Sequence, residues 1–235
     1  MRIGSTLLMA DQVCIQSYNW RMFRPLGSLQ LALNSLDEFE CDEVVIIRPI
    51  RDQDCLDNFK NDIRIISSIK TMTPLCFGGG IRDFAHLNLL KNLPIERLVF
   101  STAFIEGNSN LIKYAVEMFG NQAIQCLLPI RYHNDQAMVF NSIKNIFIPI
   151  ESLNMNFIEE YSNEIILYDV ENDGYADKFN QILLRKAPFS YDKLIITGGI
   201  GKSTISWAKR EGLASVLIDN KVLHKEYSIK DYKNV

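Results

Sequence analysis

The sequence predicts an α/β fold, a single (β/α)8 barrel built from two half-barrel repeats. Two stretches carry this prediction, Phe77–Arg82 and Thr197–Lys202, in which a glycine turn and a cation follow an apolar run. A helical pattern and another apolar run follow each stretch, so a strand–turn–helix–strand unit is written twice. Eight apolar runs alternating with helical patterns favour the barrel, and a doubly wound open sheet is the alternative.

The first half of the chain holds four of the expected strands. The run Glu43–Ile47 is β-branched after its first residue, which is typical of a parallel strand buried on both faces. Asp83 is a candidate N-cap for a helix through Leu90. We expect strands at Ile3–Met9, Glu43–Ile47, Pro74–Phe77 and Arg97–Phe100, a short return strand at Val13–Ile15, a polar loop at Ser17–Ser28, and further helices at Leu29–Phe39 and Asp54–Lys70.

The second half repeats this order with a longer connection. Pro129 is expected to stop the fifth strand, and Ala137–Phe140 and Asn145–Ile148 are expected to form an extra pair of short strands. We expect barrel strands at Ala123–Leu128, Glu164–Asp169, Lys193–Ile196 and Ser215–Ile218, helices at Asn110–Met118, Leu153–Tyr161, Ala176–Arg185 and Ser203–Arg210, and a short helix ending the tail Lys221–Lys233. No linker divides the chain, so one domain over residues 1–235 is expected.

The composition argues against several classes of protein. Of the 235 residues 47% are hydrophobic and 23% charged, and the formal net charge of −3 does not favour a nucleic-acid surface. No apolar run approaches the ~20 residues of a membrane span, and the N-terminus lacks a signal-peptide pattern. The five cysteines are scattered without a C-x-x-C pair. We therefore predict a cytoplasmic protein with reduced thiols and without a metal or other cofactor.

Both glycine turns indicate a phosphorylated ligand. Glycine lets the backbone approach a ligand closely and adopt positive φ, and the helix N-terminus that follows presents free N–H groups to an anion. In a (β/α)8 barrel the loops after the strands carry the chemistry, and both turns fall there. Two such turns predict a small molecule with two phosphates. The alternative is that they are only tight connections between a strand and a helix.

With these turns the chain resembles the barrels of histidine biosynthesis, and specifically the cyclase subunit of imidazole glycerol phosphate synthase. The resemblance covers nearly the whole chain and is strongest in Pro74–Phe104, Phe119–Ala123, Ile196–Lys202 and His224–Glu226. It implies that the two turns hold the two phosphates of a long aminoimidazole compound. The phosphate-binding residues that it implies are Gly79, Gly80, Ser101 and Thr102 at one end and Gly198, Gly199, Gly201 and Asn220 at the other.

The positions that carry the acid–base chemistry of this family hold other residues here. The resemblance places Leu8 and Pro129 where the family has its two catalytic aspartates, at the ends of the first and fifth strands. It places Arg48 and Gln16 where the family has an acidic residue and a lysine. Since losing one general acid or base costs about 10²–10⁴ in rate, the usual cyclase reaction is not expected.

Two aspartates remain as candidates for the catalytic acid and base. Asp11 matches an aspartate in the first loop of the family, and Asp173 matches an active-site aspartate in an Asp-Gly turn. For Asp173 an ordinary Asx turn is an equally good interpretation. The three histidines have no serine or cysteine partner at a readable spacing, so nucleophilic catalysis is not expected.

The starts of four strands keep the charges of the family. The resemblance places Arg2, Glu43, Arg97 and Glu164 in a ring that faces a glutaminase subunit and gates an ammonia passage, and Gln122 matches as well. The implied partner is that glutaminase, in a heterodimer. Alternating charges can also pair with each other, so a purely structural ring is the alternative.

These observations leave three hypotheses. The first is a lyase-type, ammonia-using cyclase-like subunit with a changed phosphorylated substrate. The second is a non-catalytic barrel that docks or activates a glutaminase; here the leucines of Thr6–Met9 resemble a divergent branch associated with amidation of bacterial surface sugars. The third is a genuine histidine-pathway cyclase with a rearranged site. Whether Asp11 and Asp173 reach the pocket between the phosphate sites distinguishes the first hypothesis from the second.

Overall fold

The computed structural model describes residues 1–51, 54–219 and 229–234 of the chain. At its centre eight parallel strands form a closed ring, because the last strand of each half pairs with the first strand of the other half. Around the ring they are β1 (Arg2–Ala10), β4 (Val44–Ile47), β5 (Leu75–Gly78), β6 (Arg97–Phe100), β7 (Ile124–His133), β10 (Glu164–Asp169), β11 (Leu194–Thr197) and β12 (Ser215–Ile218). The predicted (β/α)8 barrel is confirmed.

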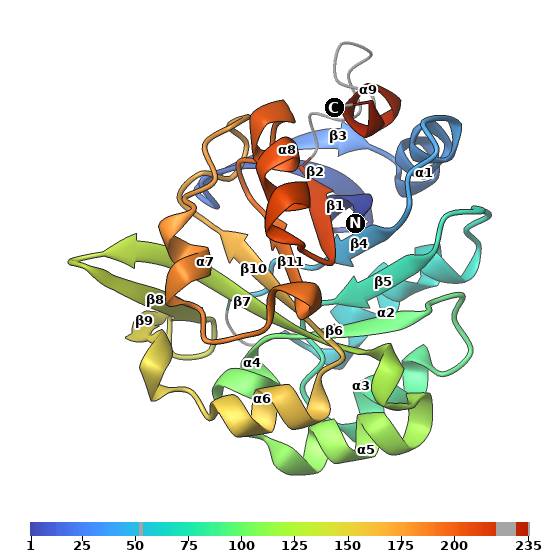
Figure 1. Ribbon diagram of the computed structural model, residues 1–235. Helices are drawn as coiled ribbons and strands as arrows, with labels where there is room; N and C mark the ends of the chain where they lie inside the picture. The colour runs from blue at the N-terminus through green and yellow to red at the C-terminus, as the bar shows by residue number, and fades with distance from the viewer. Residues whose placement is uncertain (52–53, 220–228, 235) are drawn as a thin grey trace.

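Helices surround this ring (Figure 1). The predicted N-cap is confirmed, since the Asp83 carboxylate accepts hydrogen bonds from the backbone N–H groups of Ala85 and His86. None of the described helices is both long enough and apolar enough to cross a membrane. The helices are α1 (Leu29–Glu38), α2 (Leu56–Ser67), α3 (Phe84–Leu90), α4 (Thr102–Ile105), α5 (Ser109–Phe119), α6 (Met155–Tyr161), α7 (Ile182–Lys186), α8 (Lys202–Glu211) and α9 (Ile229–Lys233), with 3-10 turns η1 (Asn121–Ala123), η2 (Ile150–Ser152) and η3 (Tyr191–Lys193).

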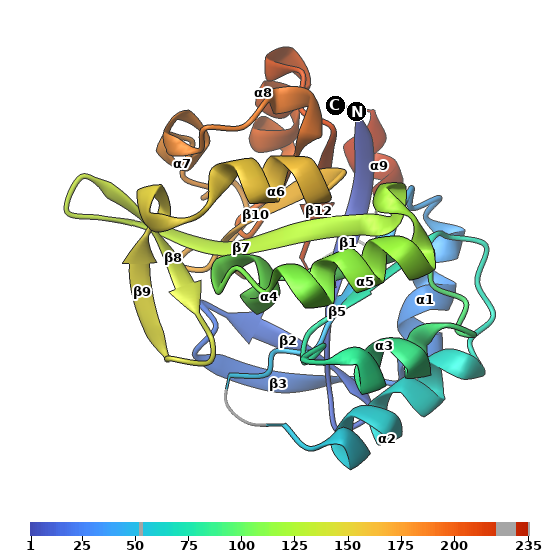
Figure 2. The same ribbon diagram turned by 90° about the horizontal axis from the view of Figure 1, so that it is seen from below.

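Each half of the barrel carries an antiparallel insertion after its first strand (Figure 2). In the first half, β2 (Val13–Tyr18) pairs with the end of β1, and β3 (Met22–Gly27) pairs with β2. In the second half, β8 (Gln136–Asn141) pairs with the end of β7, and β9 (Ile146–Pro149) pairs with β8. The extra pair of strands predicted in the second half is confirmed, and the internal repeat includes both insertions.

Three predicted boundaries were wrong. The polar loop expected at Ser17–Ser28 contains β3, an outer strand in which Pro25 is tolerated because only β2 pairs with it. Pro129 does not stop β7, which stays in register with β10 through Ile130 and is held on its other side by β8. The helix expected at Ala176–Arg185 is confined to α7, because Lys178 and Phe179 instead donate backbone hydrogen bonds to Gly199.

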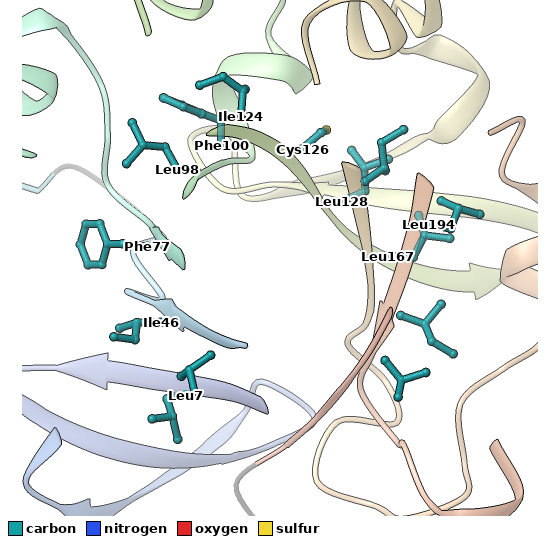
Figure 3. Packing of buried hydrophobic residues seen from close by; sticks show 14 of the residues in the cluster. Leu7, Ile46, Phe77, Leu98, Phe100, Ile124, Cys126, Leu128, Leu167 and Leu194 are labelled. Carbon is teal, nitrogen blue, oxygen red and sulfur yellow. The ribbon is translucent and has the colours of Figure 1, made fainter. Parts of the chain in front are cut away.

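Alternation along the barrel strands divides the buried side chains into two clusters. Leu7, Ile46 and Phe77 belong to the outer cluster, which packs between the strands and the helices (Figure 3). Leu8 and Ile47 belong to the inner cluster, which fills the barrel. Full burial of one such side chain contributes ~1.5–3 kcal/mol, so both layers fix the strand positions from which the loops of the site project.

Candidate functional site

A cavity lies at the carboxyl ends of the barrel strands and is lined by the first glycine turn. We call it the glycine cavity. Its polar lining comes from the loops after β4, β5 and β6 and from the β8–β9 insertion, and its floor is apolar. The polar residues are Arg48, Arg51, Arg82, Ser101, Thr102 and Ser142, and the floor consists of Ile47, Val99, Leu127 and Pro129.

The first glycine turn is a backbone cradle at the edge of this cavity. Gly79 and Gly80 have φ of +96° and +80°, which favour glycine. A Cβ on Gly79 would lie 2.1 Å from the carbonyl oxygen of Arg48, so only glycine fits there. Ser101 and Thr102 line the same cavity, and the side chain of Ser101 does not cap α4. The four residues predicted for the first phosphate are therefore brought together.

Arg48 supports this turn from below. Its side chain is almost fully buried, and its guanidinium pairs with Asp54 at 2.8 Å and with Asp62 at 2.7 Å. The guanidinium carbon also lies 5.0 Å from the ring centroid of Phe59. Because two carboxylates already balance its charge, Arg48 positions the turn and is not the cation left for a ligand. The partner Asp62 lies on α2, and sequence reasoning missed it.

Two other arginines face the glycine cavity without an ion pair to a described residue. Burial lowers the pKa of the Arg82 guanidinium, and the charge of Asp54 opposes that shift. Arg51 donates a hydrogen bond to the carbonyl oxygen of Trp20 and lies 5.9 Å from the ring centroid of Phe140. A partly desolvated cation beside free backbone N–H groups is an environment that favours an anion.

The level at which the family would carry its acid and base is apolar. Leu8 is 1% exposed and pairs in register with Ile47 of the neighbouring strand. Pro129 lies on the cavity floor and pairs in register with Tyr168. Among the described residues that line the glycine cavity, none carries a carboxylate or an imidazole.

The two candidate catalytic aspartates lie apart from this cavity. Asp11 is exposed in the turn between β1 and β2 and borders a separate hollow that Arg48 and Asp62 also line. Asp173 is 1% exposed, and its Oδ1 accepts a hydrogen bond from the Tyr168 hydroxyl at 2.8 Å. Burial, reinforced by the nearby charge of Asp219, raises the pKa of Asp173 to about 7. Catalytic roles for both aspartates stay predictions.

The second glycine turn has the same backbone shape but is covered. Gly198 and Gly199 have φ of +85° and +81°, and both are buried together with Gly201. The carboxylate of Asp177 lies against Gly201 and accepts hydrogen bonds from Ser203 Oγ at 2.7 Å and from the backbone N–H of Thr204 at 3.1 Å. Asn220, the fourth residue predicted for this end, lies outside the described residues.

The four charges predicted at the opposite end of the barrel form one network. Arg2 pairs with Glu43 at 3.0 Å and with Glu164 at 2.5 Å, and Arg97 lies 3.4 Å from the second carboxylate oxygen of Glu43. Gly4 leaves room for this network, because a Cβ there would lie 2.6 Å from Glu43 Cγ.

A glutamine joins this network, but it is not the one that the sequence suggested. Gln125, at the start of β7, donates a hydrogen bond to Glu164 at 3.0 Å. Gln122 is exposed in η1, outside the network. Side chains along a strand point alternately to the two faces of the sheet. Applied to Ile124–Leu128, this alternation could have predicted that Gln125 faces the inside of the barrel.

Comparisons with known proteins show which proteins this chain resembles in sequence. A model of the histidine biosynthesis protein family matches residues 51–228. A Campylobacter jejuni protein, provisionally named imidazole glycerol phosphate synthase subunit hisF2, is 24% identical over 99% of this chain and 93% of its own. The imidazole glycerol phosphate synthase subunit HisF of Saccharolobus solfataricus is 27% identical over 98% of this chain and 94% of its own.

An isomerase is similar as well, at the same level of identity but over a shorter part of the chain. The imidazole-4-carboxamide isomerase of Shewanella halifaxensis is 27% identical over 68% of this chain and 67% of its own. The predicted resemblance to the cyclase subunit is confirmed by the subunits named above, over nearly the full length of the chain. The chain therefore belongs to the histidine biosynthesis protein family.

Proposed function

We propose that this chain is a cyclase-type subunit that binds a phosphorylated small molecule at the carboxyl ends of its strands and a glutaminase subunit at their amino ends. One observation carries the proposal. The glycine cavity keeps the donors and cations that hold a phosphate, while its described lining holds no group able to transfer a proton at neutral pH. The reaction of the complex is therefore not the ring closure of the family.

The proposed phosphate position lies between the first glycine turn and α4. The positive φ of Gly79 and Gly80 directs the turn around a concave backbone, and such a concavity with its N–H groups is a recurring anion site. Ser101 and Thr102 would add hydroxyl donors, and Arg82 would add a charge-assisted hydrogen bond. Arg48 would hold the turn without touching the ligand.

The proposed glutaminase position is the charged ring at the amino ends of the strands. The glutamates of the ring are buried, whereas the side chains of Arg2 and Arg97 are 34% and 25% exposed. Two partly exposed cations, held in place by two buried carboxylates that balance their charge, form a fixed rim with the cations on its exposed side. Such a rim suits a partner with acidic groups, which would gain orientation and a faster encounter.

A second candidate function is a barrel that regulates its partner without transforming a substrate. Asp11 and Asp173 both lie outside the glycine cavity, and this placement favours a binding role over acid–base catalysis. In that case the phosphorylated ligand would act as a signal, and the glutaminase would perform the chemistry. Glutamine hydrolysis by the complex would then rise with the ligand while the ligand itself stays unchanged.

Copurification with a glutaminase subunit tests the partner. We expect Arg2→Glu to weaken the complex at least ~10-fold, about 1.4 kcal/mol, because it places a like charge beside Glu43 and Glu164. Lys186→Glu on α7 makes the same change of charge on an exposed helix and should leave the complex intact. Equal binding by wild type and Arg2→Glu would rule out the ring as the interface.

Complementation tests the reaction. A strain that lacks its histidine-pathway cyclase should not grow without histidine when it expresses this chain, because Leu8 and Pro129 cannot transfer protons. Restoring aspartate at both positions in the same strain is the matched comparison. Growth with the unmodified chain would instead establish a cyclase with a rearranged site.

A further inference from the structure

The first glycine turn is open to a ligand, but the second is closed by the protein itself. The Asp177 side chain reaches the amino end of α8 from the loop after β10, and one of its oxygens takes hydrogen bonds from Ser203 and Thr204. A Cβ on Gly201 would lie 2.4–2.6 Å from the atoms of this carboxylate, so it rests directly on the turn. These hydrogen bonds outweigh burial and lower the pKa of Asp177, so it is ionised at neutral pH.

An anion at the second turn would therefore meet a carboxylate that already occupies the donors. Lys178 and Phe179 further fasten the covering loop, since their backbone N–H groups each lie 3.0 Å from the carbonyl oxygen of Gly199. A phosphate would have to displace these contacts and overcome the repulsion of a like charge. The second acidic group of a ligand needs another place.

A second cavity beside the glycine cavity offers that place, and we call it the arginine cavity. The two cavities share Trp20, Arg51 and Phe140 in their linings, so they lie side by side. Arg21 and Arg131 add two more cations, against a single acidic residue in the lining, Glu171. None of the three arginines forms an ion pair with a residue that the structure describes.

Arg131 is the central cation of this cavity. Its guanidinium carbon lies 3.7 Å from the ring centroid of Phe147, which fixes the plane of the group. Its Nε is buried and has no hydrogen-bond partner among the described residues. A buried donor without a partner is costly, and an acidic ligand group would satisfy it. Arg131 reaches this position only because β7 continues past Pro129.

The middle of the combined cavity is aromatic. Trp20 stands in the turn between β2 and β3 and is fixed by an edge-on contact with Tyr168, with ring centroids 5.0 Å apart. Phe140 of β8 packs against Phe147 of β9, with centroids 5.1 Å apart. A flat group between the two acidic ends of a ligand could lie against Trp20 and Phe140.

We propose that the ligand is an elongated compound with one phosphate at the first glycine turn and a second acidic group in the arginine cavity, while Asp177 replaces any ligand group at the second turn. This inference rests on the proposed function, because it assumes that the glycine cavity binds a phosphorylated compound. It assigns the two antiparallel insertions as the elements that determine ligand specificity.

Calorimetric titration with inorganic phosphate, in the whole protein, tests the inference. We expect the wild type to bind two equivalents. Arg21→Gln with Arg131→Gln should weaken one of them at least 10-fold, and Arg82→Gln with Thr102→Val should weaken the other to the same extent. Ser203→Ala should change neither. Asp177→Ser should add an equivalent that disappears again when Ser203→Ala is combined with it. Thermal melts of each variant check that the fold is intact.

The outcomes separate the inference from the proposed function. One result would overturn the inference: a bound phosphate that is lost in Ser203→Ala but kept in the Arg21 and Arg131 double variant. The proposed phosphate site at the first glycine turn would still stand. A single equivalent in the wild type, lost in the Arg82 and Thr102 double variant, would do the same. Binding that the Arg82 and Thr102 double variant does not weaken would refute the phosphate site of the proposed function, and the inference with it.

Discussion

The two halves of the barrel share one backbone plan and differ in the charge at one equivalent point. Gly79 in the first half rests on the residue that follows β4, and Gly198 in the second half rests on the last residue of β10. A Cβ on either glycine would lie 2.1 or 2.2 Å from a carbonyl oxygen, that of Arg48 or that of Asp169. The supporting residue is a cation in one half and an anion in the other.

This difference decides which turn stays open. Arg48 points inward to Asp54 and Asp62. Arg48, Ile50 and Asp54 lie against Gly80, but Gly79 and Gly80 stay partly exposed and line the glycine cavity. Asp169 instead accepts hydrogen bonds from the backbone N–H groups of Glu171, Asn172 and Asn180 and from the Asn172 side chain, and these bonds draw the loop across the second turn. A repeated fold can thus keep its backbone in both halves while only one half keeps a binding site.

The largest predicted effect tests whether the two turns share one backbone plan. Gly79→Ala and Gly198→Ala should destabilise the protein to a similar extent, by roughly 2–6 kcal/mol. The cost sums backbone strain at positive φ, about 1–3 kcal/mol, and overpacking against a carbonyl group that cannot move, also about 1–3 kcal/mol. Urea unfolding measures both. Gly107→Ala, at positive φ but with open space around it, is the control and should cost less.

The next largest predicted loss of stability tests whether Arg48 supports the first glycine turn. Arg48→Met should cost roughly 3–5 kcal/mol in the free energy of unfolding, because it leaves Asp54 and Asp62 facing each other without their buried cation. Asp57→Asn on α2, the helix that carries Asp62, removes an exposed ion pair with Lys60 and should cost less than about 0.5 kcal/mol. Similar losses for the two variants would mean that Arg48 does not hold the first turn.

Much of this comparison was visible in the sequence, because local patterns set the strands. Buried β-branched runs such as Glu43–Ile47 and the paired glycine turns predicted the barrel and its repeat. The charged ring was predicted as well, since Arg2 and Glu43 keep their places at strand starts. Local rules failed where tertiary pairing overrides them, as in β3 and in the continuation of β7 through Pro129.

The state of each site depends on contacts between distant residues, and these left no local signal. In the sequence Asp177 is one acidic loop residue among several. Only the folded structure places it beside Ser203, 26 positions later. In the sequence Asp173 stands in an Asp-Gly turn, and only the folded structure shows that it is buried against Tyr168. The arginine cavity unites a turn, a strand end and an insertion from both halves. Such sites could be predicted only from the assembled structure.

A third prediction concerns the acid buried in the second half. The pKa of Asp173 is raised to about 7 in the folded chain, whereas an unfolded aspartate has a pKa near ~3.9. The folded state therefore keeps a proton that the unfolded state releases, and the contribution of this group to stability falls as pH rises from about 4 to 7, by as much as ~1.4 kcal/mol per pH unit.

Asp173→Asn should remove this dependence. The asparagine oxygen can still accept the hydrogen bond of Tyr168, and no charge develops at high pH. We expect the variant to exceed the wild type by roughly 2–4 kcal/mol at pH 8 and to show a flatter profile in urea unfolding between pH 4 and 8. Glu117→Gln, at an exposed position on α5, should leave the profile unchanged. A profile that Asp173→Asn does not flatten would place the ionised form of Asp173 in the folded protein.

The smallest predicted change in stability tests the second glycine turn, which Asp177 closes. Each glycine turn is followed by a helix whose amino end is capped by an aspartate, but α3 uses its own Asp83 and α8 borrows Asp177 from another loop. Removing either carboxylate, by Asp83→Ala or Asp177→Ala, should therefore cost about 0.5–2 kcal/mol in thermal or urea unfolding.

Phosphate should then separate the two variants. In Asp177→Ala the amino end of α8 is left with free donors, and added phosphate should restore part of the lost stability, since a ligand that binds only the folded state stabilises it. In Asp83→Ala phosphate should raise stability no more than it does in the wild type, because the first turn is open in both. A phosphate response of Asp177→Ala equal to that of the wild type would mean that the carboxylate does not occupy an anion site, and the two halves would then differ only in charge.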